Sequence, residues 1–381
     1  MGFLTKVMMA IVITVLSTLG NADGPPSPDE VLAIPTDLEQ LLNDHLEVQR
    51  LTRDQLLDGL VEFIFSPQGL NFQYIAYPTR DVSGTFEHRE GNCLSVTLLF
   101  MALAHRMGLE AAAREVSVPM DWRREGSSLF EVGHINVLVT TPLRKAIVDF
   151  EPDPIVARRT SAVHMGKTVS VRRMLAHFYN NRAAELLNNG DLEQAVAWSD
   201  QALKLAPGFS QALNNRGVIA SRGGEVPAAE SFYQASLELD PNNTSTLLNL
   251  ISLYRRQNDE TRTQRYQKRL ENLRPRDPFF LWALGQEYAT NGEFSRARRM
   301  FSRARRLMPE EPKFHASLAE IHWQNGEPQR ALGLLQKALK LVDTDDPLRQ
   351  QYLNQLYSMG GCSAIPGVKP ETEDCSALIS G

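Results

Sequence analysis

Proline returns at a constant interval in the C-terminal half of the chain, and this interval limits the possible folds more than any other feature. Pro207, Pro241, Pro275 and Pro309 follow one another every 34 residues. In the same frame glycine recurs at positions 190, 224, 292 and 326, and alanine at positions 195, 229, 297 and 331. In a unit of two helices glycine turns the chain, alanine allows close packing and proline stops the second helix. The interval therefore predicts a stack of helix pairs.

These positions resemble those of the tetratricopeptide repeat, a unit of two antiparallel helices. The most complete copy spans residues 278–311, whereas Asn258 and Thr263 replace the glycine and the alanine in residues 244–277. The resemblance implies an all-α solenoid over residues 170–358, with five repeats and a capping helix near residues 346–358. Residues 359–381 would form a tail. Such stacks present a concave groove, so we expect a protein or peptide partner.

Three asparagines occupy one position of this repeat. Asn181, Asn215 and Asn249 are spaced by the repeat length, so they predict a ladder that could bind the backbone of a partner in the groove. The other interpretation is that asparagine serves packing within the repeats. Both interpretations place the ladder on the first helices of the repeats.

Charge is distributed unevenly along the chain. The formal net charge is −5, which disfavours nucleic acid as a partner, because binding of nucleic acid relies on a cationic surface. Between Arg255 and Arg306, however, 14 Lys and Arg stand against 6 Asp and Glu. This local excess indicates either a solvated outer face or an anionic partner.

The N-terminus has the pattern of a secretory signal. Lys6 precedes an apolar run from Val7 to Leu19, and small residues lead to Ala22, where cleavage is expected. We therefore predict a signal peptide at residues 1–22 and a flexible leader at residues 23–30, with an uncleaved anchor as the alternative. The mature protein would be periplasmic or secreted and would have no integral membrane span.

The chain contains only three cysteines. They form no CxxC pair or His-rich cluster, so we expect no metal site and no cofactor. Cys362 and Cys375 lie in the tail, and an oxidising compartment would join them in a disulfide. Cys93 stands alone, at the start of an apolar segment that runs from Leu94 to Met107 and predicts a buried helix. A thiol at a helix N-terminus is favoured as the nucleophilic thiolate.

Two segments after this helix predict a hairpin. Residues 130–139 alternate as a strand, residues 145–150 form the next one, and the polar segment around Asp121 is typical of a loop. If the turn centres on Thr141 and Pro142, His134 lies directly across from Asp149. A shift of the turn by one step would leave the two as diagonal neighbours.

Cys93, His134 and Asp149 occur in the order and with the spacing found in the transglutaminase-like superfamily, and the whole chain resembles exported bacterial proteins that join such a domain to tetratricopeptide repeats. The resemblance implies an α+β, papain-like domain over residues 31–169 and a Cys-His-Asp triad for acyl transfer through a thioester. Gln73 and Tyr74 are candidates for the oxyanion hole. A peptidase or amidase and a transamidase both fit these residues, and a noncatalytic peptide-binding adaptor is the alternative.

Overall fold

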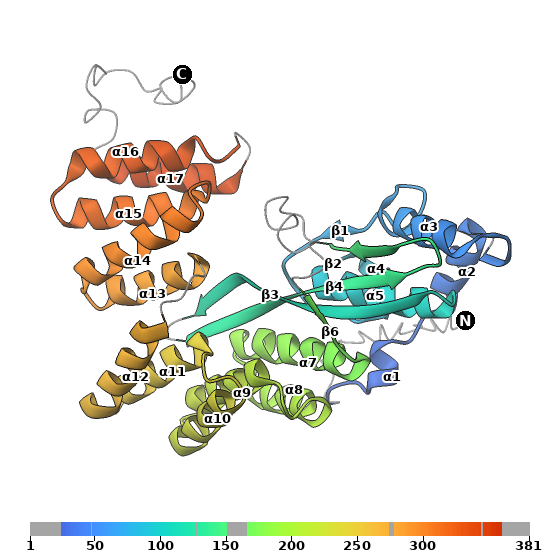
Figure 1. Cartoon of the computed structure of the whole chain (residues 1–381), viewed down its shortest axis with the longest axis horizontal. Coiled ribbons are helices and arrows are strands. Elements are labelled where there is room, and N and C mark those ends of the chain that lie inside the picture. Colours follow the sequence, from blue (N-terminus) through green and yellow to red (C-terminus); the bar gives the residue numbers. More distant parts are fainter. Residues whose placement is uncertain are drawn as a thin grey trace, which may run out of the picture.

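The computed structural model describes residues 24–46, 48–125, 128–150, 166–273, 278–343 and 346–359. Two parts follow each other along the chain: an N-terminal part of helices and strands, and a C-terminal part of stacked helices (Figure 1). The expected signal peptide and the expected Cys362–Cys375 disulfide lie outside the described residues. For residues 117–125 and 128–134 the backbone is described and the side chains are not.

Short helices and strands surround one long buried helix in the N-terminal part. That helix is α5, and it packs against the apolar sides of α2 and α3 and against the sheet. The elements of this part are α1 (Pro28–Val31), α2 (Thr36–His45), a 3-10 turn (Val48–Arg50), α3 (Arg53–Phe65), β1 (Gln73–Tyr74), α4 (Val82–His88), β2 (Glu90–Gly91), α5 (Cys93–Arg106), β3 (Glu110–Glu125), β4 (Ser128–Thr140), β5 (Lys145–Val148) and β6 (Gly166–Thr168).

Four of these strands form one antiparallel sheet in the order β5-β4-β3-β6. Val137 and Val139 of β4 are fully buried in the core shared with α5, and they alternate with residues on the other face of the sheet. Phe150, just beyond β5, belongs to the same core, because its ring lies 5.8 Å from that of Phe100 on α5. The expected hairpin between residues 130–139 and 145–150 is therefore present as β4 and β5.

The hairpin of β3 and β4 is longer than the sequence indicated. The segment around Asp121, which we expected to be a loop, belongs to β3, and Asp121 pairs with Val132 after an irregularity that follows Val116. Its polar composition lacks the alternation of a half-buried strand, so the pattern gave no strand signal. Pairing with β4 supplies the backbone hydrogen bonds that the local sequence does not predict.

The C-terminal part consists of helix pairs that stack in chain order (Figure 1). Within the described residues these are α7 (Val171–Asn188) with α8 (Leu192–Leu205), α9 (Ser210–Arg222) with α10 (Val226–Leu239), α11 (Thr244–Arg256) with α12 (Glu260–Leu273), α13 (Pro278–Thr290) with α14 (Phe294–Leu307), and α15 (Pro312–Gln324) with α16 (Pro328–Leu339), followed by α17 (Pro347–Ser358).

The turn inside each pair requires a left-handed residue. Gly190, Gly224, Gly292 and Gly326 have φ between 72° and 84°, and Asn258 takes the same place between α11 and α12 with φ 57°. Asparagine tolerates this conformation better than most residues with a Cβ, so the degraded repeat keeps its turn.

The β3–β4 hairpin extends beyond the N-terminal part and lies across the repeats (Figure 1). β3 contacts α7 and α13, and β4 contacts α9 and α11. These four are the first helices of successive pairs. Residues 245–254 of α11 are all buried, on every side of the helix. A first helix of a repeat stack normally leaves one side open to the groove, so the hairpin occupies the groove over these repeats.

A charged contact also joins the two parts of the molecule. The carboxylate of Glu115 on β3 accepts hydrogen bonds from Arg173 and from His177, both on α7, with 2.6 Å to His177 Nε2. Arg173 lies 3.6 Å above the centre of the Phe209 ring. Burial raises the pKa of Glu115, but the hydrogen bonds and charges of His177 and Arg173 outweigh it and lower that pKa to about 2. Burial lowers the pKa of His177, which Glu115 opposes.

Candidate functional site

Cys93 is the first residue of α5, as the sequence predicted. It is a free cysteine with a half-buried side chain. Asn92 caps the helix: its Oδ1 accepts from the backbone N–H groups of Leu94 and Ser95 at 3.1 and 3.0 Å. The cap fixes the first turn of α5 and places the thiol at the positive end of the helix dipole.

The cap of α5 is tied to the repeats by a chain of hydrogen bonds. Asn92 Nδ2 donates to Thr79 Oγ1 at 2.7 Å, and the Thr79 hydroxyl and backbone N–H both donate to Glu185 of α7, at 2.7 and 2.8 Å. Arg182 neutralises the other oxygen of Glu185 at 2.6 Å. The position of Cys93 therefore depends on a side chain of the first repeat.

Gln73 and Tyr74 lie beside the segment that leads to Cys93. The parallel pairing of β1 with β2 sets Gln73 against Glu90 and Tyr74 against Gly91, two residues before the cysteine. Both side chains are exposed, and Gln73 Nε2 donates to the backbone oxygen of Asn71 at 3.1 Å. Gln73 and Tyr74 precede Cys93 by about twenty residues in the sequence, and the strand pairing brings them next to the segment that leads to Cys93.

His134 and Asp149 are diagonal neighbours rather than directly opposite. Thr140 pairs with Lys145 and Val137 with Val148, so Asn136 stands across from Asp149. His134 lies two residues earlier in β4, in register with Val116. The turn is therefore centred one step later than Thr141 and Pro142. The side chain of His134 is not among those that the structure describes, so the triad stays a prediction.

Arg114 and Asn136 complete a buried polar group around Asp149. Asn136 Nδ2 donates to Asp149 Oδ2 at 2.9 Å, and Arg114 Nη1 approaches Asn136 Oδ1 at 3.5 Å. Arg114 is 2% exposed and Asn136 is fully buried. Burial lowers the pKa of Arg114, while the negative charge of Asp149 raises it. Sequence reasoning missed both residues, although a lone arginine after Ala111–Ala113 and an asparagine inside an apolar strand were signals of a polar site.

Hydrogen bonds join asparagines of successive first helices, but the bonded set differs by one residue from the predicted ladder. Asn215 Nδ2 donates to Asn180 Oδ1 at 3.0 Å, Asn214 donates to Asn215 at 3.2 Å, and Asn249 donates to Asn214 at 3.0 Å. The first link starts at Asn180, whereas Asn181 is half-buried and outside this chain of bonds. Asn215 and Asn249 are 2% and 3% exposed. The ladder lies in the part of the groove that the hairpin covers.

The groove is open over the last repeats. A depression of about 370 Å³ lies between α13, α15 and α17. Trp282 and Tyr352 give it an aromatic wall, and Trp282 Nε1 donates to Ser317 Oγ at 2.8 Å. Gln286, Gln351 and Gln355 add amide groups, with Lys313 and Glu320 as opposite charges at its edge; Leu348, Phe301, Ile321, Ala289, Ala316 and Ser317 complete the lining.

Two features are absent from the described ranges. No group of three or more His, Cys, Asp or Glu side chains in these ranges could hold a metal ion. No helix of the described chain is both long and apolar enough to cross a membrane.

Comparison with known proteins identifies the repeats. Residues 180–244 and 283–346 match the family model described as tetratricopeptide repeat, which confirms that prediction. Among solved structures the chain is similar to TTC0263, a thermophilic TPR protein of Thermus thermophilus, at 24% identity over 48% of this chain and 99% of that chain, with a TM-score of 0.36. It is also similar to YrrB, a TPR protein with an unusual peptide-binding site, at 20% identity over 48% and 92%, with a TM-score of 0.31.

A third similar structure is MamA, residues 41 to the end, from Desulfovibrio magneticus RS-1, at 19% identity over 45% of this chain and 97% of that chain, with a TM-score of 0.33. None of the curated proteins matches the chain. The family match lies within the helical repeats, so the transglutaminase-like resemblance of residues 31–169 stays a prediction. The C-terminal part of this chain is a tetratricopeptide-repeat-like region, and repeats of this kind bind proteins or peptides.

Proposed function

We propose that the protein is an adaptor that binds an extended segment of another protein in the depression between α13, α15 and α17. The observation that carries this proposal is the division of the groove. The hairpin contacts α7, α9, α11 and α13, whereas beyond it residues of α13, α15 and α17 line a depression that stays open. The open end of the groove is therefore the surface on which a partner can be held.

The lining of the depression favours a peptide in extended form. Trp282 and Tyr352 offer an apolar wall for one side chain of the ligand. Side-chain amides such as Gln286 and Gln351 can both donate to and accept from a peptide backbone, which a strand-like ligand needs. Lys313 and Glu320 add one cation and one carboxylate to the lining, so they can pair with charged groups of the bound chain.

The test uses the full chain and peptides selected on it from a displayed library of random sequences. The double variant Gln286→Ala, Gln351→Ala should bind the selected peptides with roughly tenfold lower affinity, because two hydrogen bonds to the peptide are lost. The matched control is Gln234→Ala on α10, an exposed glutamine that bonds only Glu230 among the described residues. Equal affinity of the double variant and the wild type would place the peptide elsewhere and contradict the proposal.

A second function is favoured by the surroundings of Cys93. We propose that the N-terminal part is a cysteine-dependent acyl-transfer domain, a peptidase, amidase or transamidase, in which Cys93 is the nucleophile, His134 the base and Asp149 its orienting carboxylate. The supporting observation is the β1–β2 pairing, which places Gln73 and Tyr74 next to the residues preceding Cys93, where a second oxyanion donor is required. Export to the periplasm or medium is part of the same proposal.

Alkylation of the reduced full chain tests this second function. Iodoacetamide at pH 6–7, followed by peptide mass spectrometry, should modify Cys93 much faster than Cys362 and Cys375. His134→Ala should slow the alkylation of Cys93 to the rate found for Cys362 and Cys375. If Cys93 already reacts no faster than they do in the wild type, the acyl-transfer proposal is wrong and the adaptor proposal is unaffected.

A further inference from the structure

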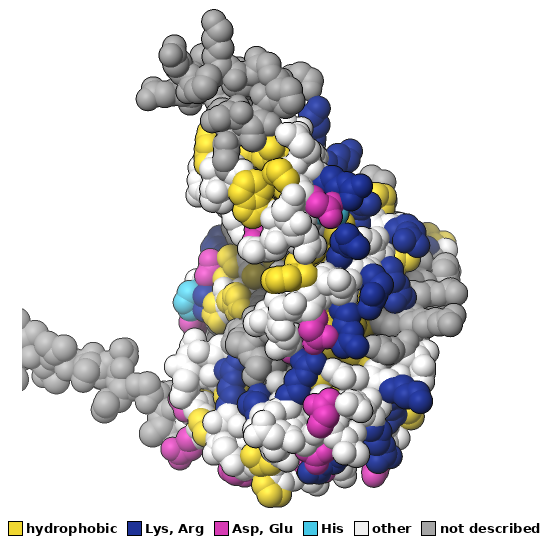
Figure 2. Space-filling model, turned by 90° about the vertical axis from the view of Figure 1, so that its left-hand side faces the viewer, with side chains coloured by type: hydrophobic (Ala, Val, Ile, Leu, Met, Phe, Trp, Pro, Cys, Tyr) yellow, Lys and Arg dark blue, Asp and Glu magenta, His cyan; other side chains and the backbone are white. Residues whose placement is uncertain are grey.

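The outer side of the last repeats carries a strong positive charge. Helix α14 has six arginines and no acidic residue, in the sequence FSRARRMFSRARRL. Helix α10, the second helix two repeats earlier, has glutamates and no Lys or Arg. Figure 2 shows Lys and Arg side chains gathered in a band on the face that it views. The charge belongs to the second helices, so it lies away from the concave groove.

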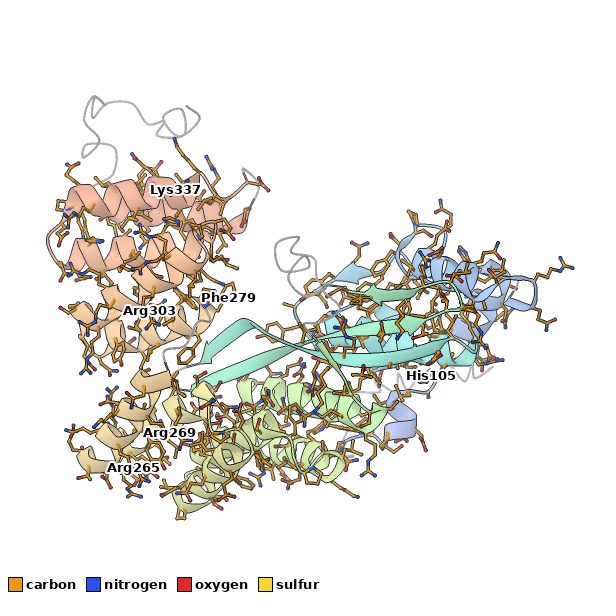
Figure 3. All side chains as sticks on the ribbon, viewed as in Figure 1. His105, Arg265, Arg269, Phe279, Arg303 and Lys337 are labelled. Atoms are coloured by element: carbon orange, nitrogen blue, oxygen red, sulfur yellow. The ribbon has the colours of Figure 1, made fainter. Side chains whose placement is uncertain are left out.

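Part of this band follows the repeat itself. Arg269 on α12, Arg303 on α14 and Lys337 on α16 occupy the same repeat position, 34 residues apart. Figure 3 shows them one above another along the last helix pairs, with Arg265 beside Arg269. Cations therefore continue from one second helix to the next across the last three pairs.

Two depressions in this surface run along α14. One, of about 520 Å³, is lined by Arg298, Arg299, Ser302, Arg303, Arg306 and His322. The other, of about 620 Å³, is lined by Ser302, Arg305, Arg306, Pro309, Glu310, His315, Lys337 and Leu341. Ser302 and Arg306 line both, so the two depressions form one continuous trough. Glu310 contributes a carboxylate at one end of it.

Several of these cations have no acidic partner. Among the described residues Arg299, Arg305, Arg306 and Lys337 form no ion pair, whereas Arg298 approaches Glu327 at 3.8 Å. Arg299, Arg303 and Arg306 are spaced by four and three residues, so they lie on one face and repel one another. The C-terminal dipole of α14 favours Arg305 and Arg306, but it does not reach Arg299. A bound anion would relieve this repulsion.

His315, on α15, adds a polar side chain to this surface. It lines the larger depression, is 5% exposed, and its Nδ1 has no hydrogen-bond partner in the described structure. Its other nitrogen, Nε2, donates to the backbone oxygen of Pro309 at 2.7 Å, so Nδ1 can donate to a ligand only when the imidazole is protonated. A polyanion in the depression would favour that protonated form.

We propose that this trough binds a linear oligophosphate, a ligand separate from the peptide in the concave groove. Guanidinium groups match the oxygens of phosphate in pairs, and the Ser302 hydroxyl can donate between the two depressions. Arg299 and Arg306 are seven residues apart, so the trough extends about 10 Å along the helix axis. That length suits several linked phosphate groups, each neutralising two or more of the arginines, better than a single phosphate.

Calorimetric titration of the full chain with sodium tripolyphosphate tests the proposal. We expect binding that weakens as salt is raised, and affinity for inorganic phosphate at least tenfold lower. Arg299→Gln with Arg306→Gln should lower the tripolyphosphate affinity by roughly tenfold for each arginine. The matched control, Arg265→Gln with Lys268→Gln, removes the same charge from exposed sites on α12 that line neither depression.

Three further results would contradict the oligophosphate proposal. Equal loss in the control variant would assign binding to the general field of the band and overturn the proposal. Tighter binding of a hexaglutamate peptide than of tripolyphosphate would assign the trough to an acidic protein. Vesicles of anionic phospholipid test whether the phosphate comes from a lipid. Tripolyphosphate should displace the protein from these vesicles. Protein that stays bound to the vesicles in the presence of tripolyphosphate would contradict the proposal. Peptide binding in the concave groove is measured separately and is independent of all these results.

Discussion

Replacement of Glu115 by Gln should remove the pH-dependent part of the contact between the sheet and the first repeat. Glu115 accepts hydrogen bonds from Arg173 and His177, and these lower its pKa from 4.5 to about 2. A carboxylate whose pKa is depressed in the folded state stabilises that state above its unfolded pKa. The stability is therefore present above pH 4.5 and lost as pH falls from 4.5 towards 2.

The size of the effect follows from the same two values. The difference between 4.5 and about 2, at about 1.4 kcal/mol per pH unit, corresponds to about 3 kcal/mol of unfolding free energy. Glu115 is 27% exposed, so solvent screens the pair only in part. The charge of Glu115 is also the partner of Arg173, and Gln keeps the shape of the side chain but not this charge. We therefore expect the variant to lose up to about 3 kcal/mol at pH 7.

The assay is urea unfolding of wild type and variant, followed by tryptophan fluorescence at several values between pH 7 and pH 3. The free-energy difference should shrink as pH falls below about 5. Glu193→Gln, at an exposed site on α8, is the control and should give no difference. If the wild type stays more stable than the variant by the same free energy down to pH 3, the contact is not ionic in origin.

Other predictions concern the repeats and the cap of α5. Gly285→Ala should destabilise the protein by about 1–3 kcal/mol, because the added Cβ would stand 2.5 Å from the Phe301 ring; thermal unfolding measures it. Asn92→Ala should cost about 1–2 kcal/mol through the lost cap, seen as faster amide exchange in the first turn of α5. Asn214→Ala removes the oxygen that accepts from Asn249 and should cost about 1–3 kcal/mol in urea unfolding.

The repeats were predictable because each marker has a local cause. Positive φ at Gly190 and at its equivalents is a backbone requirement of the turn, so it leaves the same residue type at a fixed interval. Asn258 is a weaker marker, because its residue type differs from glycine and only its place in the repeat identified the turn. The offset of the asparagine ladder was not predictable. Contacts between successive first helices join residues 35 apart, as in Asn180 with Asn215 and Trp282 with Ser317.

The N-terminal site was predictable in its parts and not in its arrangement. The buried helix from Cys93 and the hairpin after it follow from apolar patterning. The register of that hairpin depends on the turn after Thr140, which no local signal fixed to the residue. The outer half of β3 was missed because its pairing partner lies in β4 and the repeat helix α13, which β3 contacts, is far away in the chain.

The hairpin has a consequence for how the solenoid folds. A repeat array normally folds by nearest-neighbour contacts, and a fragment of it can fold alone. Here the groove side of α11 is closed by strands that precede it by more than a hundred residues, so this part of the array has high contact order. A chain that begins at residue 170 would leave the groove side of α11 uncovered and would be prone to aggregate. The repeats and the sheet therefore form one cooperative folding unit, and truncation between them is the cut that this chain tolerates least.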